Sequence, residues 1–462
     1  MIKLSLGQIA QVISGELVNA SPDLEVSGTV RTDSRLVSPG DIFFAKLGEH
    51  EDGHRYLDSI DGVAALAVVS EVRADLNLPQ IKVSDTVVAL SELAKFVLSM
   101  VRPAGLKVIG ITGSNGKTSA KNMLAAITSR VGKTVAPQDS FNNEVGLPLT
   151  VLRLELDTKF LILELGASGL GSIDRLASWT LPDIGIQLKV GMAHAGAFGG
   201  IEVTAQIKAE MMPYIGQVAL LNQDDPIVSD FSPEPGVRRL GFGYSSESDL
   251  QLVRVGVTIS GTTVLLRYPD GEEHELTLKI LGEHQAMNAA AALLAAHELG
   301  IERTVALGAL EELDIAERWR MQPLRRKDGV LIINDAYNAS PDSMRAGLQT
   351  LATIGRQGHR TIAVLGLMAE LGDQTRAEHE TVGRLVVRYN IDKLFVVGKE
   401  AKILHLSATQ EGSWDGESEF YEKASDAFDA ISAKLLPGDV VLVKSSNVAG
   451  LRFLGDELAG VK

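Results

Sequence analysis

Cysteine is absent from the 462 residues of this chain. Its absence excludes disulfides, thiolate nucleophiles and cysteine metal sites, and it agrees with a reducing compartment, so we expect a cytoplasmic protein. A basic excess is missing as well, because 44 Lys and Arg residues face 59 Asp and Glu residues and leave a net charge of −15. An acidic chain of this kind lacks the overall positive charge that is typical of nucleic-acid-binding proteins. An anionic ligand would therefore have to be held by local cations and backbone N–H groups.

Long hydrophobic runs are also missing. No apolar run reaches the length that spans a membrane, and residues 1–18 carry polar interruptions at Gln8, Gln11 and Glu16 that do not fit a signal peptide. We therefore expect no membrane insertion. The hydrophobic fraction of 45% and the charged fraction of 22% are ordinary for a soluble globular protein, but the chain is too long for one hydrophobic core.

Apolar periodicity divides the chain into three parts. A helical pattern precedes Pro103 and Gly105, strand-like and helical patterns then alternate, and this alternation restarts near residue 316. Such alternation predicts an α/β protein with mainly parallel sheets, in three domains at 1–100, 101–315 and 316–462. The expected strands are 64–70, 80–84, 107–112, 160–166, 183–191, 217–225, 330–335, 361–366, 393–398 and 439–446, with a hairpin at 251–271 and helices at 87–100 and 284–300.

A glycine-rich loop at 110–118, GITGSNGKT, follows one of these strands and opens a helical pattern. Glycines let backbone N–H groups approach phosphate oxygens, the helix N-terminus adds partial positive charge, Lys117 adds a full one, and the Thr118 hydroxyl can ligate Mg²⁺. The usual pattern has Gly six positions before the Lys, but this chain has Ile111 there and the glycine one position earlier. The loop predicts nucleotide binding but no particular reaction, since GTPases and transport ATPases share it.

Several other segments narrow this prediction. They are DSR at 33–35, PGDIFFA at 39–45, DGH at 52–54, FNN at 141–143, GLPLT at 146–150 and DAYNASP at 335–341 with Ser343 and Met344. Together with the loop, these segments resemble the Mur ligases over all three expected domains, and most closely the MurF type. The DNPR motif of the sister ligase that adds the third peptide residue is absent.

The resemblance implies an N-terminal α/β uridine-nucleotide domain, a central P-loop ATPase-like domain and a C-terminal Rossmann-like domain. It also implies a monomeric ligase of peptidoglycan precursor synthesis, which joins D-alanyl-D-alanine to the carboxylate of UDP-N-acetylmuramoyl-tripeptide. ATP would convert that carboxylate to an acyl phosphate, which the amine then attacks, so the protein mainly has to position groups and neutralise charge. Two Mg²⁺ ions and a lysine carbamylated by CO₂ are implied as well.

Site residues follow from the same resemblance, position by position. For ATP they are Gly113, Ser114, Asn115, Gly116, Lys117, Thr118, Ser119, Asn288, Arg320 and Asp335, with Asn222 as a second candidate for reading adenine. For Mg²⁺ they are Thr118, Glu164, His194 and Lys208 as its carbamate. For the UDP substrate they are Ser34, Arg35, Asn142 and Asn143, and for the acceptor cleft Tyr337 and Asn338. The implied catalytic residues are Lys117, His194, Lys208 and Arg320.

Several of these residues also have a plainer interpretation. Mg²⁺ prefers oxygen ligands, so His194 can instead be a loop histidine with a backbone partner. A lone lysine on a helix, such as Lys208, is normally solvated, and Asn222 and Asp335 can be turn residues at strand ends. The role of Lys444 stays open. The departures from the family pattern are Ser168, Lys189, Ser340, Leu367 and the VKSSN stretch at 443–447; they bear on acceptor fit and remove no phosphate or metal group.

Two other functions remain open at this point. A folylpolyglutamate synthase would share the chemistry, but it should lack the uridine-type N-terminal domain and the Asn-Ala-Ser-Pro segment at 338–341. A nucleotide-dependent switch or binding module would share the loop alone. It would not explain why Glu164, His194 and Lys208 occur in the family order. The sequence also leaves open whether the third peptide residue of the substrate is lysine or diaminopimelate.

Overall fold

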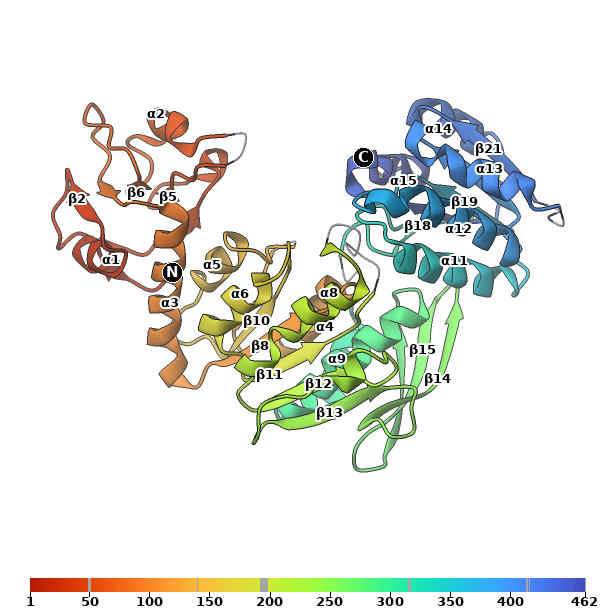
Figure 1. Ribbon diagram of the computed structural model, residues 1–462, viewed down its shortest axis with the longest axis horizontal. Coiled ribbons are helices and arrows are strands. Elements are labelled where there is room, and N and C mark those ends of the chain that lie inside the picture. The colour runs from red at the N-terminus through yellow and green to blue at the C-terminus, as the bar shows by residue number, and fades with distance from the viewer. Residues whose placement is uncertain are drawn as a thin grey trace.

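Three α/β parts follow one another along the chain, each built on its own sheet. The computed structural model describes residues 1–48, 51–138, 140–191, 198–314, 317–412, 414 and 416–461. The central part lies between the other two (Figure 1). The expected α/β class with three domains is confirmed. No helix in the described ranges is long and apolar enough to cross a membrane.

The N-terminal part has a five-stranded sheet in the order β2-β7-β6-β5-β4 and a small β1–β3 pair. Its elements are β1 (Leu4–Ser5), α1 (Leu6–Val12), β2 (Glu16–Val18), β3 (Glu25–Val26), β4 (Val30–Arg31), β5 (Ile42–Phe44), α2 (Leu57–Ile60), β6 (Leu66–Val69), β7 (Gln80–Lys82) and α3 (Thr86–Val101). Asp85 begins α3 by accepting the backbone N–H groups of Val87 and Val88. The apolar side of α3 shares one hydrophobic core with the central part, so this helix couples the two.

The central part has a nine-stranded sheet in the order β16-β15-β14-β13-β12-β11-β8-β10-β9. Its strands are β8 (Lys107–Thr112), β9 (Thr134–Val135), β10 (Phe160–Glu164), β11 (Ile184–Gln187), β12 (Val218–Asn222), β13 (Arg238–Gly243), β14 (Leu250–Thr258), β15 (Gly261–Arg267) and β16 (Glu273–Leu278). Strands β8 to β14 pair in parallel, whereas β14, β15 and β16 pair antiparallel. The predicted hairpin is therefore confirmed, and a third strand that was not predicted extends it.

Helices cover both faces of this sheet. They are α4 (Lys117–Thr128), α5 (Gly146–Val151), α6 (Ser172–Thr180), α8 (Ile201–Ala209), α9 (Glu283–Glu298) and α10 (Arg303–Glu311). The alanine-rich α9 packs against both α4 and β14, because its small side chains allow close approach. This packing brings the start of α9 beside the glycine-rich loop that precedes α4.

The C-terminal part has a six-stranded sheet in the order β17-β18-β22-β19-β20-β21, parallel except for β17. Its strands are β17 (Gln322–Arg325), β18 (Leu331–Asn334), β19 (Thr361–Leu365), β20 (Lys393–Val397), β21 (Glu417–Tyr421) and β22 (Val440–Lys444). Its helices are α11 (Pro341–Gly355), α12 (Thr375–Arg388), α13 (Lys402–Gln410), α14 (Ala424–Ser432) and α15 (Leu451–Ala459).

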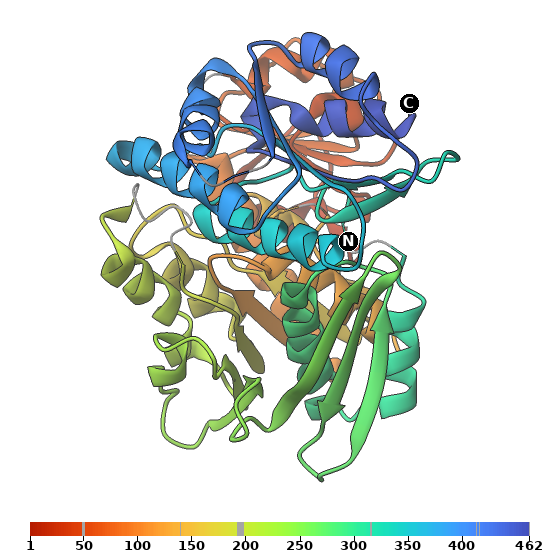
Figure 2. The same ribbon diagram turned by 90° about the vertical axis from the view of Figure 1, so that its right-hand side faces the viewer.

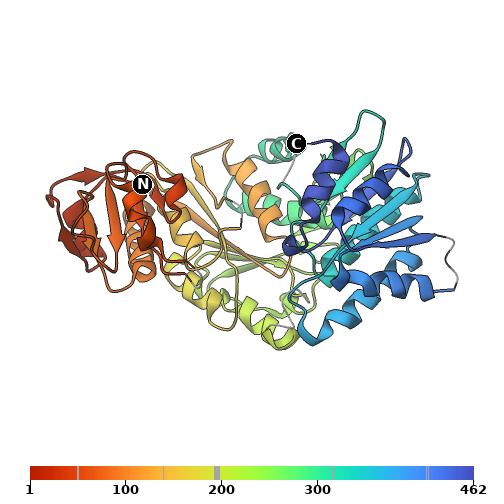
Figure 3. The ribbon, with the colours of Figure 1, turned by 90° about the horizontal axis from the view of Figure 1, so that it is seen from above.

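Helix α11 lies along the junction between the central and C-terminal parts, where it contacts α9 and β14 (Figure 2). Seen from above, the N-terminal and C-terminal parts flank the central part on opposite sides (Figure 3). The expected limits near residues 100 and 315 fall where the chain passes from one sheet to the next, and no strand is shared between sheets among the described residues. As limits of separate folding units they stay predictions.

Candidate active site

The glycine-rich loop joins β8 to α4 at the edge where the parallel strands end. Gly113 (φ 145°) and Gly116 (φ 90°) have backbone conformations that other residues rarely adopt, and a Cβ on Gly113 would come within 3.0 Å of Leu188 Cβ. Ser114 ties the loop to the segment after β11, because its N–H donates to Lys189 O at 2.7 Å. The loop therefore has a fixed shape at the positive N-terminus of α4.

Lys117 opens α4 and is folded over the loop. Its Nζ donates to Gly113 O at 2.7 Å and to Ser114 O at 3.4 Å. Burial lowers the pKa of Lys117; the charge of Glu164 opposes this shift and that of Arg320 adds to it. A half-buried cation that is held by backbone carbonyls is well placed to receive an anionic phosphate.

Glu164 ends β10 with a carboxylate that is 1% exposed. It accepts the Thr118 hydroxyl at 3.0 Å and Asn142 Nδ2 at 2.9 Å. Thr118 and Glu164 both offer oxygen, the donor type that Mg²⁺ prefers. His194, the third expected ligand, lies outside the described residues. Within the described part of the chain, no three His, Cys, Asp or Glu side chains gather as a metal site.

Lys208 lies in the last turn of α8 and is 4% exposed, so it is not a solvated surface lysine. Its backbone carbonyl accepts Gln187 Nε2 at 2.7 Å, which ties α8 to the end of β11. Burial, and next the charge of Lys117, lower the pKa of Lys208 to about 7, while Glu210 and Glu164 act in the opposite direction. The charged groups around Lys208 therefore include the loop lysine and the expected Mg²⁺ ligand.

Arg320 and Tyr337 face the loop from the C-terminal part. The Arg320 guanidinium lies over the Tyr337 ring, 4.6 Å from its centroid, and donates to Ser140 Oγ at 3.2 Å. Its Nε is buried without a hydrogen-bond partner among the described residues. Arg320 thus reaches from the C-terminal part to the central part and keeps one donor free.

Asp335 follows β18 and pairs with Lys444, which is almost fully buried, at 2.5 Å. Lys444 also donates to Asn338 O at 3.1 Å, and the second carboxylate oxygen of Asp335 accepts Met321 N–H at 3.0 Å. Lys444 therefore holds Asp335 and the following loop in place, a role that the sequence left open.

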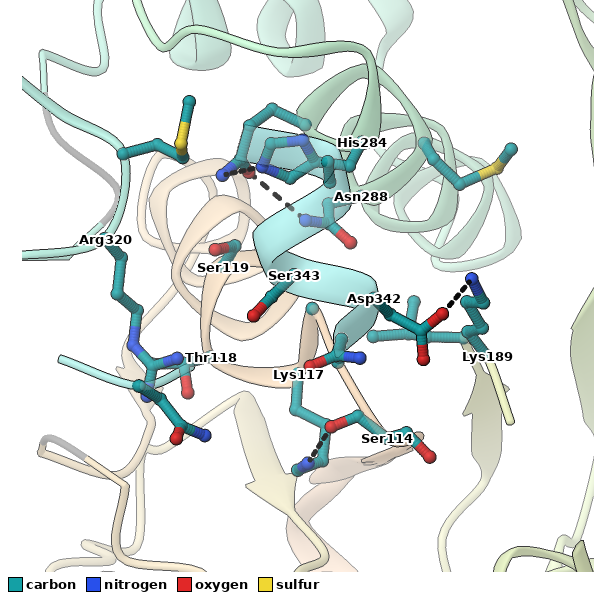
Figure 4. Close-up of a pocket in the computed structure, with 18 of the residues that line it drawn as sticks. Ser114, Lys117, Thr118, Ser119, Lys189, His284, Asn288, Arg320, Asp342 and Ser343 are labelled. Atoms are coloured by element: carbon teal, nitrogen blue, oxygen red, sulfur yellow. Dashed lines mark hydrogen bonds and ion pairs between the residues drawn. The ribbon is translucent and has the colours of Figure 1, made fainter. Parts of the chain in front are cut away.

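A cavity of about 350 Å³ lies between these two groups of residues (Figure 4). The predicted site residues that line it are Ser114, Asn115, Gly116, Lys117, Thr118, Ser119, Asn142, Glu164, Asn222, Asn288, Arg320, Asp335, Tyr337 and Asn338. The structure thus brings together most of the expected ATP and acceptor-cleft residues from two separate sheets.

The structure does not bring the expected UDP-site residues to this cavity as a group. Among the described residues, Ser34, Arg35 and Asn143 are not part of its lining. Arg35 is exposed and pairs with Asp33 at 2.6 Å, whereas Asn143 accepts Gly146 N–H at the start of α5. Gly113 and Lys208 also lie outside the lining. The UDP-site residues stay a prediction.

Sequence reasoning missed several lining residues. They are Ser140, His284, Gln285 and Asp342. Asp342, in the first turn of α11, forms an ion pair with Lys189 at 3.5 Å, which joins the C-terminal part to the central part (Figure 4). Burial lowers the pKa of His284 to about 4; the charge of Asp335 opposes this shift and that of Lys444 adds to it. Two of these residues could have been found from their place in the sequence. His284 opens a predicted helix, and Asp342 directly follows the DAYNASP segment.

The residues present fit ATP and Mg²⁺. Asn115 Nδ2 is buried without a partner among the described residues, as is Arg320 Nε. Buried donors require acceptors, and a triphosphate at the N-terminus of α4 supplies them beside Lys117. Asn288 donates to Gln285 Oε1 at 3.1 Å, which fixes the amide at the cavity wall. Thr118 and Glu164 offer oxygen ligands to a cation on the phosphates.

Comparison with known proteins agrees with this geometry. The family model described as Mur ligase middle domain matches residues 111–296, and the one described as Mur ligase, glutamate ligase domain matches residues 319–447. These ranges contain residues 111–118 of the glycine-rich loop and the Arg320–Asp335 region, respectively.

Full-length relatives extend the match to the N-terminal part. A UDP-N-acetylmuramoyl-tripeptide–D-alanyl-D-alanine ligase of Mycobacterium tuberculosis is 39% identical over 99% of this chain and 98% of its own length. The crystal structure of MurF from Acinetobacter baumannii is 28% identical, with a TM-score of 0.88 and 99% of each chain covered. MurF ligase from Thermotoga maritima in complex with ADP is 26% identical, with a TM-score of 0.80 over 94% of this chain and 98% of that one. This chain therefore belongs to the Mur ligase family.

Proposed function

We propose that this protein is an ATP-dependent ligase that joins D-alanyl-D-alanine to the carboxylate of UDP-N-acetylmuramoyl-tripeptide and releases ADP and phosphate. The observation that carries the proposal is the cavity in which the glycine-rich loop of one sheet faces Arg320 and Asp335 of another. The Mycobacterium tuberculosis relative, matched over almost its whole length, bears the name of this activity. The step belongs to peptidoglycan precursor synthesis.

The reaction proceeds in two transfers. The tripeptide carboxylate attacks the γ-phosphorus of ATP, ADP leaves, and an acyl phosphate forms. The free amine of D-alanyl-D-alanine then attacks the acyl carbon, the C–O bond to phosphate breaks, and the amine loses its proton to solvent. Lys117 and Arg320 neutralise the charge on the transferring phosphoryl group from two sides, and closure of the two parts around the ligands would limit hydrolysis of the acyl phosphate.

Thr118, Glu164 and Lys208 are the described residues that we assign to Mg²⁺; His194 joins them on the resemblance alone. Bound Mg²⁺ supplies further charge neutralisation at phosphate oxygens. A Lys208 ammonium would repel the ion, whereas its carbamate offers two anionic oxygens. The burial of Lys208 near Lys117 and Glu164 supports this assignment, because CO₂ combines with a neutral amine and releases a proton.

In our proposal, the other two substrates approach this cavity from opposite sides. We assign the UDP group to the N-terminal part, with Ser34, Arg35, Asn142 and Asn143 as its contacts. Asn142 supports an approach of the UDP-linked substrate from the N-terminal part, because it lines the cavity and donates to Glu164. Tyr337 and Asn338 line the C-terminal side, from which the D-alanyl-D-alanine amine has to approach.

The test is phosphate release by the purified protein with ATP, Mg²⁺, UDP-N-acetylmuramoyl-tripeptide and D-alanyl-D-alanine, with the product identified by mass. We expect release only when all are present, and a product that contains the added dipeptide. Release with a folate and glutamate in their place would indicate a folylpolyglutamate synthase. Release without any acceptor would indicate a nucleotide switch, and either result would overturn the proposal.

A further inference from the structure

The turn that presents Arg320 to the cavity has an unusual backbone. Trp319 (φ 59°) and Met321 (φ 47°), on either side of Arg320, are both in the left-handed region. Residues with a Cβ adopt this region at an energetic cost, and they remain there only when the surroundings hold them. Two such residues around one functional side chain require specific contacts that keep the turn in place.

The backbone of the turn has three such contacts. Trp319 N–H donates to Gln322 Oε1 at 3.0 Å, and Trp319 O accepts Tyr337 N–H at 3.2 Å. Met321 N–H donates to Asp335 at 3.0 Å. These bonds link the turn to its own strand, β17, and to the loop after β18, and that loop borders the cavity.

The buried carboxylate of Asp456 holds two side chains of the turn, on the side away from the cavity. Asp456 of α15 is 7% exposed, and one of its oxygens accepts both Trp319 Nε1 at 2.9 Å and Arg318 NH2 at 3.0 Å. Its other oxygen accepts Asn334 Nδ2 at 3.0 Å, from the end of β18. Asp456 therefore joins the turn, the last helix and strand β18 of the C-terminal sheet.

The surroundings leave this arrangement little freedom. A Cβ on Gly455 would come within 2.5 Å of Asn334 Nδ2, so α15 lies close against β18. The Trp319 ring packs edge to face with Phe453, and the Arg318 and Arg452 guanidinium groups lie over it. The indole is thus held on its faces and at its N–H, and it cannot rotate without breaking the bond to Asp456.

Asp456 does not itself reach the site. Among the described residues, neither Asp456 nor Trp319 lines either of the two neighbouring cavities, whereas Arg320 and Met321 do line the first. Any effect of Asp456 on the reaction therefore has to pass through its partners, which are the turn and Asn334 at the end of β18.

We propose that Asp456 is a positioning residue which, through Trp319 and Arg318, fixes the turn that directs Arg320 at the phosphates of the nucleotide. The inference rests on the proposed function, which assigns Arg320 to the transferring phosphoryl group. A purely structural carboxylate would stabilise the fold and leave Arg320 unaffected. The position of the turn is a property of the ligand-free chain, so it can be measured without turnover.

The first measurement is hydrogen exchange of residues 317–322 in the ligand-free protein. Asp456→Asn keeps the shape but removes the charge and one acceptor. Asp439→Asn is the matched control, because Asp439 is a buried carboxylate of the same sheet that pairs with Arg360 at 2.7 Å, away from the turn. We expect faster exchange in 317–322 for Asp456→Asn and wild-type exchange there for Asp439→Asn. Wild-type protection in the Asp456 variant would overturn the proposal even if the protein had no ligase activity.

The second measurement is a double-mutant cycle on turnover. We expect Asp456→Asn to lower kcat by about 10- to 100-fold with little change in the KM for ATP, as for a small displacement of a positioned group. In an Arg320→Lys background the same change should cost less than about 2-fold, since the guanidinium is already gone. The proposal would be overturned if the fold-losses of kcat in the two single variants multiplied fully in the double variant. It would also be overturned if Asp439→Asn lowered kcat as much as Asp456→Asn does.

Trp319→Phe provides a second variant if Asp456→Asn does not fold. It keeps an aromatic ring between Phe453 and the arginines, although a smaller one, and it removes the indole N–H that Asp456 accepts. We expect the same faster exchange and the same loss of kcat, and a variant with wild-type values for both would count against the proposal. An inactive wild-type protein with a normally protected turn would instead overturn the proposed function.

Discussion

Lys189 and Asp342 form an ion pair at 3.5 Å across the cleft between the central and C-terminal parts. Both side chains are partly exposed, so the pair contributes at most about 1 kcal/mol and weakens with salt. Such a pair favours the arrangement in which the central and C-terminal parts lie close together, but it is too weak to hold them there permanently. We expect the ligand-free protein to expand as salt increases, and we expect Asp342→Asn to reduce that response, measured by small-angle scattering.

Ligands should close the cleft further, because they add contacts to both parts. Lys117 belongs to the central part and Arg320 to the C-terminal part, so a nucleotide that contacts both draws them together. We expect small-angle scattering to show compaction when an ATP analogue and the UDP-linked tripeptide are added. An unchanged radius of gyration with both ligands bound would contradict this expectation.

Replacement of Lys117 by Ala should abolish most of the activity. The variant loses a half-buried cation next to the transferring phosphoryl group, and we expect a fall in kcat/KM on the order of 10³-fold or more. The fold should survive, because the two hydrogen bonds of the Lys117 ammonium go to backbone carbonyls of its own loop. Lys107→Ala, at the other end of β8, is the control and should keep its activity. Near-normal turnover in a folded Lys117 variant would show that the loop does not bind the phosphates.

Acid should weaken the fold through His284. The folded protein binds a proton on His284 less readily than the unfolded chain does, because burial lowers its pKa to about 4. Stability from this residue is therefore complete above about pH 6.5 and is lost as the pH falls toward 4, by about 1–3 kcal/mol. Urea unfolding across this range should show a smaller loss for His284→Gln than for the wild type. His359→Gln, outside the cavity, should follow the wild type, and identical profiles for all three would contradict the assignment.

Local patterns were enough for most of the fold. The β-branched run at 107–112 is β8, and the alanine-rich pattern at 284–300 is α9 to within two residues at either end. Strands that are buried on both faces leave a continuous apolar run in the sequence, which is why they were predicted. The strands β16, β17 and β21 were not predicted, because they lie at sheet edges, are only partly buried and leave no continuous apolar run.

The site was predictable where a motif lies in one segment, and less so where distant segments meet. The loop residues could be named from the sequence. The pairing of Lys444 with Asp335 could not, because β22 becomes the neighbour of β18 only through the sheet order. The left-handed turn around Arg320 could not be predicted from the sequence, because neither Trp319 nor Met321 is a glycine. Contacts from α15 help to hold these residues in a conformation that glycine adopts more readily.

The strongest chemical prediction is that Lys208 carries a carbamate in the active enzyme. Lys208 is 4% exposed, near Lys117 and Glu164, where a free ammonium would oppose Mg²⁺ binding. Arginine keeps the positive charge but cannot form the carbamate. We therefore expect Lys208→Arg to fold and to lose most of its activity, with Lys121→Arg on α4 as a buried-lysine comparison for stability.

The carbamate itself can be observed directly. A high-resolution structure of the Mg²⁺-loaded protein should show three additional atoms on Lys208 Nζ, and activity should fall when CO₂ is removed and return when bicarbonate is added. Removal of Mg²⁺ by a chelator should abolish phosphate release in the same assay. An unmodified Lys208 in a metal-loaded structure, together with an active Lys208→Arg variant, would exclude the carbamate. Loss of activity in the arginine variant without any dependence of the wild type on CO₂ would show that the site needs the unmodified lysine side chain, and it would also count against the carbamate.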